Sequence, residues 1–108
     1  MHEPRSITLE DPRSPEGRGI LEAFFAEVIG RYWDRSATAA EVKQEMESDP
    51  SDDLRDDTGF LLVVRDGTQA VGCGGVRFVG PGAGEITRVY IAPAARGRGV
   101  GRSLIQEH

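Results

Sequence analysis

Apolar residues in the first third of the chain follow two different periods. They alternate with polar residues over 5–10, RSITLE, which predicts a short strand. Ser14 and Pro15 then form a helix start, with proline at the first helical position. Gly17 and Gly19 weaken the first turn, so we expect the stable helix to begin near Gly19. Its apolar stripe at helical spacing is Ile20, Leu21, Phe24, Phe25, Val28 and Tyr32.

A second helix is predicted by the segment TAAE at 38–41, which matches a capping box. Thr38 is the expected cap, and the side chain of Glu41 reaches back to it. We expect this helix to run to about Glu47 and to bury two apolar residues, Val42 and Met46. The residues that follow, 48–59, are polar and acidic and predict a loop.

Beyond residue 59 the pattern changes to that of strands. A continuous apolar run at 60–64 predicts a buried strand, and RDGT after it predicts a hairpin turn in which Asp-Gly supplies positive φ. Residues 69–79 form the return strand, and 85–91 the third strand of this meander. Three glycines in the return strand predict a bulge or a close backbone approach: Gly72, Gly74 and Gly75. A glycine-rich loop and a final helix follow, so the order β-α-α-β-β-β-α predicts an α/β fold with a mixed, mostly antiparallel sheet flanked by helices.

Composition narrows the class of protein. With 108 residues, 38% hydrophobic and 29% charged, the chain is expected to be a single globular domain over residues 1–108. No apolar run approaches the roughly 20 residues that span a bilayer, and no secretory signal is visible, so we expect a cytoplasmic protein without a membrane partner. The lone cysteine, Cys73, lies in an apolar run and predicts a small core residue rather than a catalytic thiol. The only histidines, His2 and His108, argue against a histidine-based nucleophile system and against a metal site. The single lysine among thirteen basic residues is typical of a GC-rich bacterial genome.

The net charge of −5 conceals an asymmetry between the two halves. Residues 1–57 hold 15 acidic and 7 basic residues, whereas residues 58–108 hold 3 acidic and 6 basic ones. Glycine divides similarly, with 3 residues in the first part and 11 in the second. The second half therefore suits an anionic ligand, while the acidic first half suits either a cationic acceptor or solubility alone.

The anionic ligand is expected at the sequence RGRGVG, residues 96–101. A strand, a glycine-rich loop and a helix N-terminus together form an anion site, because backbone N–H groups converge there with the helix dipole. Glycines lack the Cβ that would keep a phosphate away, and neighbouring arginines add bidentate donors. Arg102 follows Gly101, which excludes a Walker A loop and the dinucleotide-binding fingerprint. An arginine-glycine segment for RNA is disfavoured by the acidic chain, so no nucleic-acid partner is expected.

This loop resembles the Gln/Arg-x-x-Gly-x-Gly/Ala signature of the GNAT superfamily of acyl-CoA N-acyltransferases. The wider segment 84–105 resembles the fourth strand, loop and third helix of that family. The resemblance implies acetyl-CoA as the acyl donor, with its pyrophosphate on the loop amides and its pantetheine arm along the strand. The residues implied to bind this donor are Val89, Tyr90, Ile91, Arg96, Gly97, Arg98, Gly99, Val100, Gly101 and Arg102.

The resemblance also implies that an amine, from a small molecule or a peptide, attacks the thioester directly. Such an amine must lose a proton, and Glu85 is the candidate general base, since a glutamate at the corresponding place has this role in some branches of the family. The alternative is that Glu85 only ends the preceding turn in solvent. Tyr90 is a poorer candidate because it is expected in the core. Tyr32 and Trp33 either border the acceptor pocket or pack inside the protein.

A complete member of this superfamily continues with a fifth strand, a further helix and usually two more strands. We expect the chain to be an incomplete N-acetyltransferase domain lacking these C-terminal strands. Two alternatives remain: a natural short form that completes its sheet with a second chain, as a homodimer would, and a non-catalytic module that binds CoA or another protein.

Overall fold

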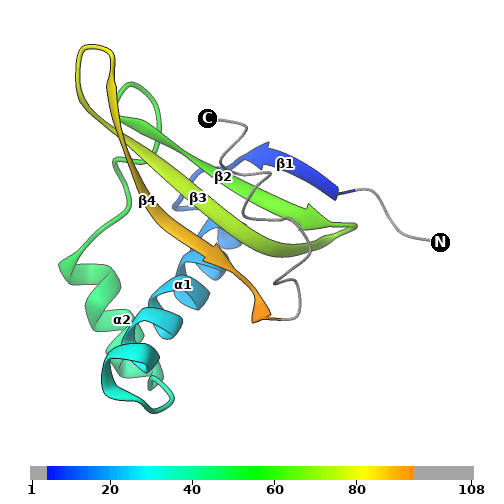
Figure 1. Cartoon of the computed structure of the whole chain (residues 1–108), viewed down its shortest axis with the longest axis vertical. Coiled ribbons are helices and arrows are strands. Elements are labelled where there is room, and N and C mark those ends of the chain that lie inside the picture. Colours follow the sequence, from blue (N-terminus) through cyan, green and yellow to red (C-terminus); the bar gives the residue numbers. More distant parts are fainter. Residues whose placement is uncertain (1–4, 94–108) are drawn as a thin grey trace.

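The computed structural model describes residues 5–93, which form a sheet and two helices (Figure 1). The elements in chain order are β1 (Arg5–Leu9), α1 (Pro15–Trp33), α2 (Ala39–Ser48), β2 (Gly59–Asp66), β3 (Gln69–Gly80) and β4 (Ala83–Ile91). The strands pair antiparallel in the order β1-β2-β3-β4, and α1 lies behind this sheet in Figure 1. The predicted α/β class and the order β-α-α-β-β-β are confirmed, while the predicted final helix lies outside the described residues.

Helix α1 begins at Pro15, so the prediction of a start near Gly19 is wrong. The Ser14 hydroxyl accepts a hydrogen bond from the Gly17 N–H at 3.0 Å and caps the first turn. A Cβ at Gly17 would lie 2.3 Å from the carbonyl oxygen of Asp11. The absence of a side chain at Gly17 therefore allows the helix to pack closely against the preceding turn. The Ser14 cap compensates for the low helix propensity of this glycine.

Helix α2 has the predicted capping box. The Glu41 N–H donates to Thr38 Oγ1 at 3.1 Å, and the Thr38 N–H donates to Glu41 Oε1 at 2.9 Å. The Arg35 guanidinium, 2.8 Å from the same carboxylate, together with the Thr38 N–H lowers the pKa of Glu41 to about 2. Val42 and Met46, which were expected to be buried, are only partly so, because α2 covers the flank of α1 rather than the sheet.

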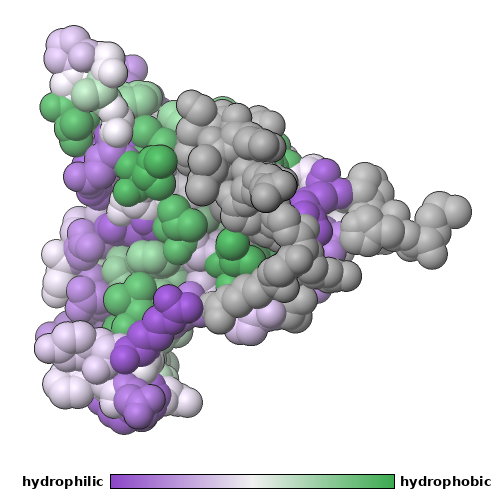
Figure 2. All heavy atoms as spheres, viewed as in Figure 1, coloured by the Kyte–Doolittle hydropathy of each residue, from purple (hydrophilic) through white to green (hydrophobic). Residues whose placement is uncertain are grey.

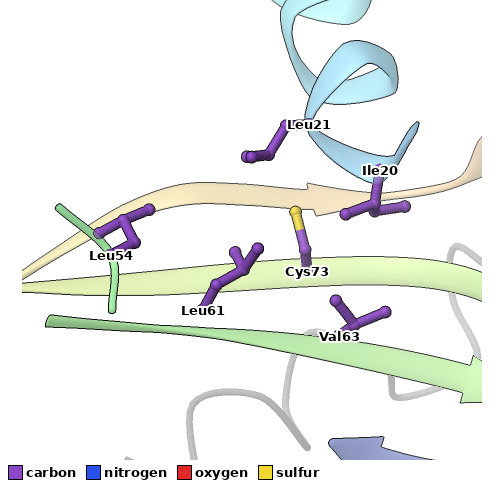
Figure 3. Packing of buried hydrophobic residues seen from close by; sticks show 6 residues of the cluster. All are labelled: Ile20, Leu21, Leu54, Leu61, Val63 and Cys73. Atoms are coloured by element: carbon purple, nitrogen blue, oxygen red, sulfur yellow. The ribbon is translucent and has the colours of Figure 1, made fainter. Parts of the chain in front are cut away.

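The main core lies between α1 and the sheet. Six side chains from α1, β2, β3 and the α2–β2 loop converge in Figure 3, namely Ile20, Leu21, Leu54, Leu61, Val63 and Cys73. Cys73 is fully buried, as predicted, and its burial raises the pKa of the thiol to about 12. Its Sγ donates to the Arg88 carbonyl oxygen at 3.1 Å, which ties the core to β4.

The opposite face of the sheet carries a second apolar cluster around Leu62, Val64 and Val71. Phe60 packs against it and makes an edge-to-face contact with Phe78 at 6.0 Å between ring centroids. Figure 2 looks onto this face and shows apolar residues along its β3–β4 side. Within residues 5–93 neither helix is long and apolar enough to cross a membrane.

Candidate active site

A β-bulge interrupts β4 in its second half. Thr87 pairs with Gly75, and Tyr90 pairs with Cys73. The two β4 residues between them, Arg88 and Val89, therefore lie opposite a single β3 residue, Gly74. Arg88 has φ 56°, the left-handed region that non-glycine residues rarely adopt. The predicted bulge in β3 is present beside Gly72, where Val71 is an extra residue between the pairs Val64–Gly72 and Arg65–Ala70. The β4 bulge lies opposite Gly74, another of the predicted glycines. The bulge bends β4 where the donor-binding segment was predicted to begin.

The Arg88 guanidinium is buried on the helix side of the sheet, where it makes polar contacts with three residues. Nε donates to Ser51 Oγ and Nη1 to Thr87 Oγ1, each at 3.1 Å. Nη2 lies 3.1 Å from the Asp49 carbonyl oxygen and 3.0 Å from Asp49 Oδ1. The guanidinium carbon also lies over two α1 rings, at 5.9 Å from Phe24 and 5.1 Å from Phe25. One side chain thus joins β4 to α1 and to the end of α2.

A cavity of about 390 Å³ adjoins this guanidinium, within the usual size range of small-molecule sites. Its walls come from α1, α2 and β4. The α1 wall consists of Phe24, Phe25, Val28, Ile29, Tyr32 and Trp33. Glu45 and Asp49 come from α2 and its C-cap, and Arg88 from β4. The site therefore combines an apolar, aromatic wall with three charged groups.

Tyr32 and Trp33 are wall residues of this cavity and not core residues. Their exposed fractions are 78% and 58%, and their rings meet edge to face at 5.0 Å. Of the two sequence-based interpretations, internal packing is therefore wrong. The end of α1 instead presents an aromatic surface to solvent beside the buried Arg88.

Glu85 lies at the start of β4, directly opposite Arg77 of β3. Its Oε1 is 3.3 Å from Arg77 Nη1, and its side chain is 56% exposed. Arg77 also binds the Asp53 carboxylate, with Nε 2.6 Å from Oδ2, and this contact lowers the pKa of Asp53. Glu85 is accessible to solvent and belongs to a charged cross-strand cluster.

The predicted donor-binding residues divide between described and undescribed parts of the chain. Val89 is 45% exposed, Tyr90 packs partly against the main core as expected, and Ile91 packs against the second cluster. The loop residues Arg96, Gly97, Arg98, Gly99, Val100, Gly101 and Arg102 lie outside the described residues. Within residues 5–93, β4 is an edge strand of the sheet.

Sequence reasoning missed Arg88, Asp49 and Ser51 as members of this site. One signal was present, because Arg88 stands inside a segment otherwise typical of a core strand. An arginine that becomes buried needs an acidic or polar partner. That partner lies 39 residues earlier in the chain, and no local pattern identifies it.

A helix pair inserted between the first two strands of an antiparallel sheet, with a bulge in the fourth strand, defines the class as an N-acyltransferase fold. A sequence profile described as the acetyltransferase (GNAT) family matches residues 21–107, and the chain belongs to this family. Comparison with curated protein sequences gives no match.

Solved structures with the same fold come mainly from bacterial acetyltransferases. A Klebsiella pneumoniae protein assigned as an acyl-CoA N-acyltransferase has a TM-score of 0.64 and 26% identity over 95% of this chain. A Thermus thermophilus acetyltransferase has a TM-score of 0.64 and 16% identity, and covers 99% of this chain and 69% of its own. An aminoglycoside acetyltransferase from an uncultured soil sample has a TM-score of 0.58, 19% identity and coverages of 96% and 68%. The chain spans 59% of the length of the Klebsiella protein.

Proposed function

We propose that the protein transfers an acetyl group from acetyl-CoA to a primary amine, by direct attack of the amine on the thioester. The observation that carries this proposal is the family match together with the bulged edge strand β4. Family membership supports acyl transfer in general. Acetyl-CoA, the amine acceptor and the residue roles below are our proposals.

The donor would bind along the outer edge of β4. Val89, Tyr90 and Ile91 would offer backbone groups to the extended pantetheine arm, as one strand does to another. At the bulge, two residues share one β3 partner, and the Val89 N–H would polarise the thioester carbonyl there. The loop from Arg96 to Arg102 would bind the phosphates, a role that rests on its sequence alone.

Glu85 would take a proton from the ammonium group of the acceptor, and the resulting neutral amine would attack the thioester. Glu85 lies three residues before Arg88 at the bulge, which is about 10 Å along β4 at about 3.3 Å per strand residue. Because the thioester would lie at the bulge, the proton would reach Glu85 through water. Arg77 contacts only Oε1, so the second carboxylate oxygen remains for this water. The leaving group departs as the CoA thiolate, and no protein group becomes acylated.

The test is thiol release from acetyl-CoA with a panel of primary amines. Glu85→Gln should lower kcat about 100-fold, with little change in KM. Glu47→Gln is the matched control, because this exposed α2 residue lies in neither the bulge nor the Arg77 cluster. Equal rates for both variants would exclude Glu85 as the base. Acetyl-CoA binding without thiol release for any amine would favour the non-catalytic module instead.

A further inference from the structure

The cavity between α1, α2 and β4 has features that define the chemistry of its ligand. Three observations bear on this: its electrostatic balance, the end of helix α2, and the exposed aromatic wall. Each is independent of the donor site on the outer edge of β4.

The cavity carries an excess of negative charge. Glu45 and Asp49 are four residues apart, so they lie on the same side of α2 and its C-cap. Among the described residues that line the wall, Arg88 is the one cation, and it is bound to Asp49 at 3.0 Å. Glu45 forms no ion pair within the described part of the chain. Among residues 5–93, one carboxylate at the cavity therefore has no cationic partner.

The C-terminus of α2 has acidic residues where helices usually favour basic ones. The negative end of a helix dipole favours basic residues, yet the last turn of α2 contains none, and Asp49 is its C-cap. Acidic groups at this end interact unfavourably with the helix dipole. Local conflicts of this kind concentrate at functional sites, and a bound cation would remove this one.

The aromatic wall is exposed without a partner in the described residues. Tyr32 and Trp33 present their rings beside Val28, which is 46% exposed. Trp33 already has the Arg35 guanidinium at 5.8 Å from its ring centroid, and that charge is neutralised by Glu41. A second cation with an apolar body would find both ring surfaces and carboxylates here.

We propose that this cavity binds the acceptor as an arylalkylamine, with its ring against Tyr32 and Trp33 and its ammonium toward Glu45 and Asp49. The inference rests on the proposed acetyl transfer only in calling this ligand the acceptor. Anionic ligands are disfavoured by the same two carboxylates and by the end of α2.

Trp33 provides a direct binding assay, because it is the single tryptophan of the chain and forms part of the wall. Phenethylamine, 2-phenylethanol and propylamine would be titrated at pH 7 while Trp33 fluorescence is followed. Phenethylamine should bind at least about five-fold more tightly than either analogue, because each lacks one of the two interactions. Added sodium chloride should weaken the binding of phenethylamine and not that of 2-phenylethanol.

Two glutamine variants of α2 isolate the role of the wall charge. Glu45→Gln should weaken phenethylamine binding about two- to five-fold, the effect of one exposed ion pair. Glu47→Gln makes the same charge change on an exposed residue outside this cavity and should leave binding unchanged. Circular dichroism would check that both variants remain helical.

The outcomes separate this inference from the proposed function. Equal affinities for phenethylamine and 2-phenylethanol, or equal weakening by the two variants, would overturn the inference. Tight binding of phenethylamine without its acetylation would uphold the cavity as an arylalkylamine site and refute the acceptor role. Acetylation of simple alkylamines without phenethylamine binding would uphold the proposed function and overturn the inference.

Discussion

The left-handed conformation of Arg88 predicts a reversal of the usual order of alanine and glycine variants. In an ordinary strand, glycine is less stable than alanine by about 0.5–1 kcal/mol, because it loses more backbone freedom on folding. At φ 56°, alanine incurs a steric cost of about 1–2 kcal/mol that glycine does not. We therefore expect Arg88→Gly to be more stable than Arg88→Ala by about 0.5–1 kcal/mol.

Both variants lose the same guanidinium, so its contacts cancel in this comparison. Against the wild type each should lose about 2–4 kcal/mol, for three hydrogen bonds and the ion pair with Asp49. This estimate is at the lower end for a buried ion pair because Asp49 is 53% exposed. A domain of ordinary stability would remain folded after such a loss.

Urea unfolding followed by far-UV circular dichroism measures the difference. Ile86 supplies the control pair, since it lies in the same strand, pairs regularly with Val76 and has no positive φ. There Ile86→Gly should be less stable than Ile86→Ala by about 0.5–1 kcal/mol. If glycine were the less stable variant at both positions, Arg88 would not hold a left-handed bulge.

Three further predictions concern the core, the start of α1 and the response to acid. Cys73 should not react with a disulfide reagent at pH 8 until the protein unfolds, since raising the pKa of its thiol from 9.0 to about 12 depletes the thiolate about 1000-fold. The same shift should reduce the free energy of unfolding as pH rises from 9 toward 12, because the unfolded chain loses this proton first. Gly17→Ala should lower the melting temperature because its Cβ would meet Asp11, whereas Gly19→Ala, with open space around it, should raise stability by up to about 1 kcal/mol. The pKa of the Asp53 carboxyl is lowered by Arg77, so the ionised carboxylate stabilises the fold above pH 4 and loses that effect as pH falls below 3.8. In a plot of the urea unfolding midpoint against pH, Asp53→Asn should reduce the slope in this acidic range.

Features encoded by neighbouring residues were predictable from the sequence. The capping box of α2 depends on two residues three positions apart, and both of its hydrogen bonds are present. The β2–β3 turn depends on one glycine, and Gly67 has the positive φ that the pattern predicts. The core position of Cys73 followed from the apolar run around it. In each case the physical cause lies within a few residues of the effect.

Features that depend on distant contacts were not predictable in this way. Leu54 stands in an acidic loop, yet it is fully buried because Gly75, 21 residues later, leaves room for its side chain. Arg88 stands in a strand pattern, yet its conformation and burial depend on Asp49 and Ser51. Only the assembled sheet brings these pairs together, so a residue-by-residue pattern assigns Leu54 to a loop and Arg88 to a regular strand.

Asp49 contacts both halves of the proposed site, and this limits how acceptor preference can change. Its Oδ1 holds Arg88 at the bulge, while its position at the end of α2 places it in the cavity wall. A substitution at Asp49 that altered acceptor binding would also release a buried guanidinium, and would therefore alter the strand proposed to bind the donor. Tyr32 and Glu45 line the same cavity, and neither is among the hydrogen-bond or ion-pair partners of Arg88 within the described residues. Under the proposed function, acceptor preference would therefore vary at these two positions while the bulge is kept, because both side chains line the proposed acceptor cavity and neither belongs to the proposed donor strand.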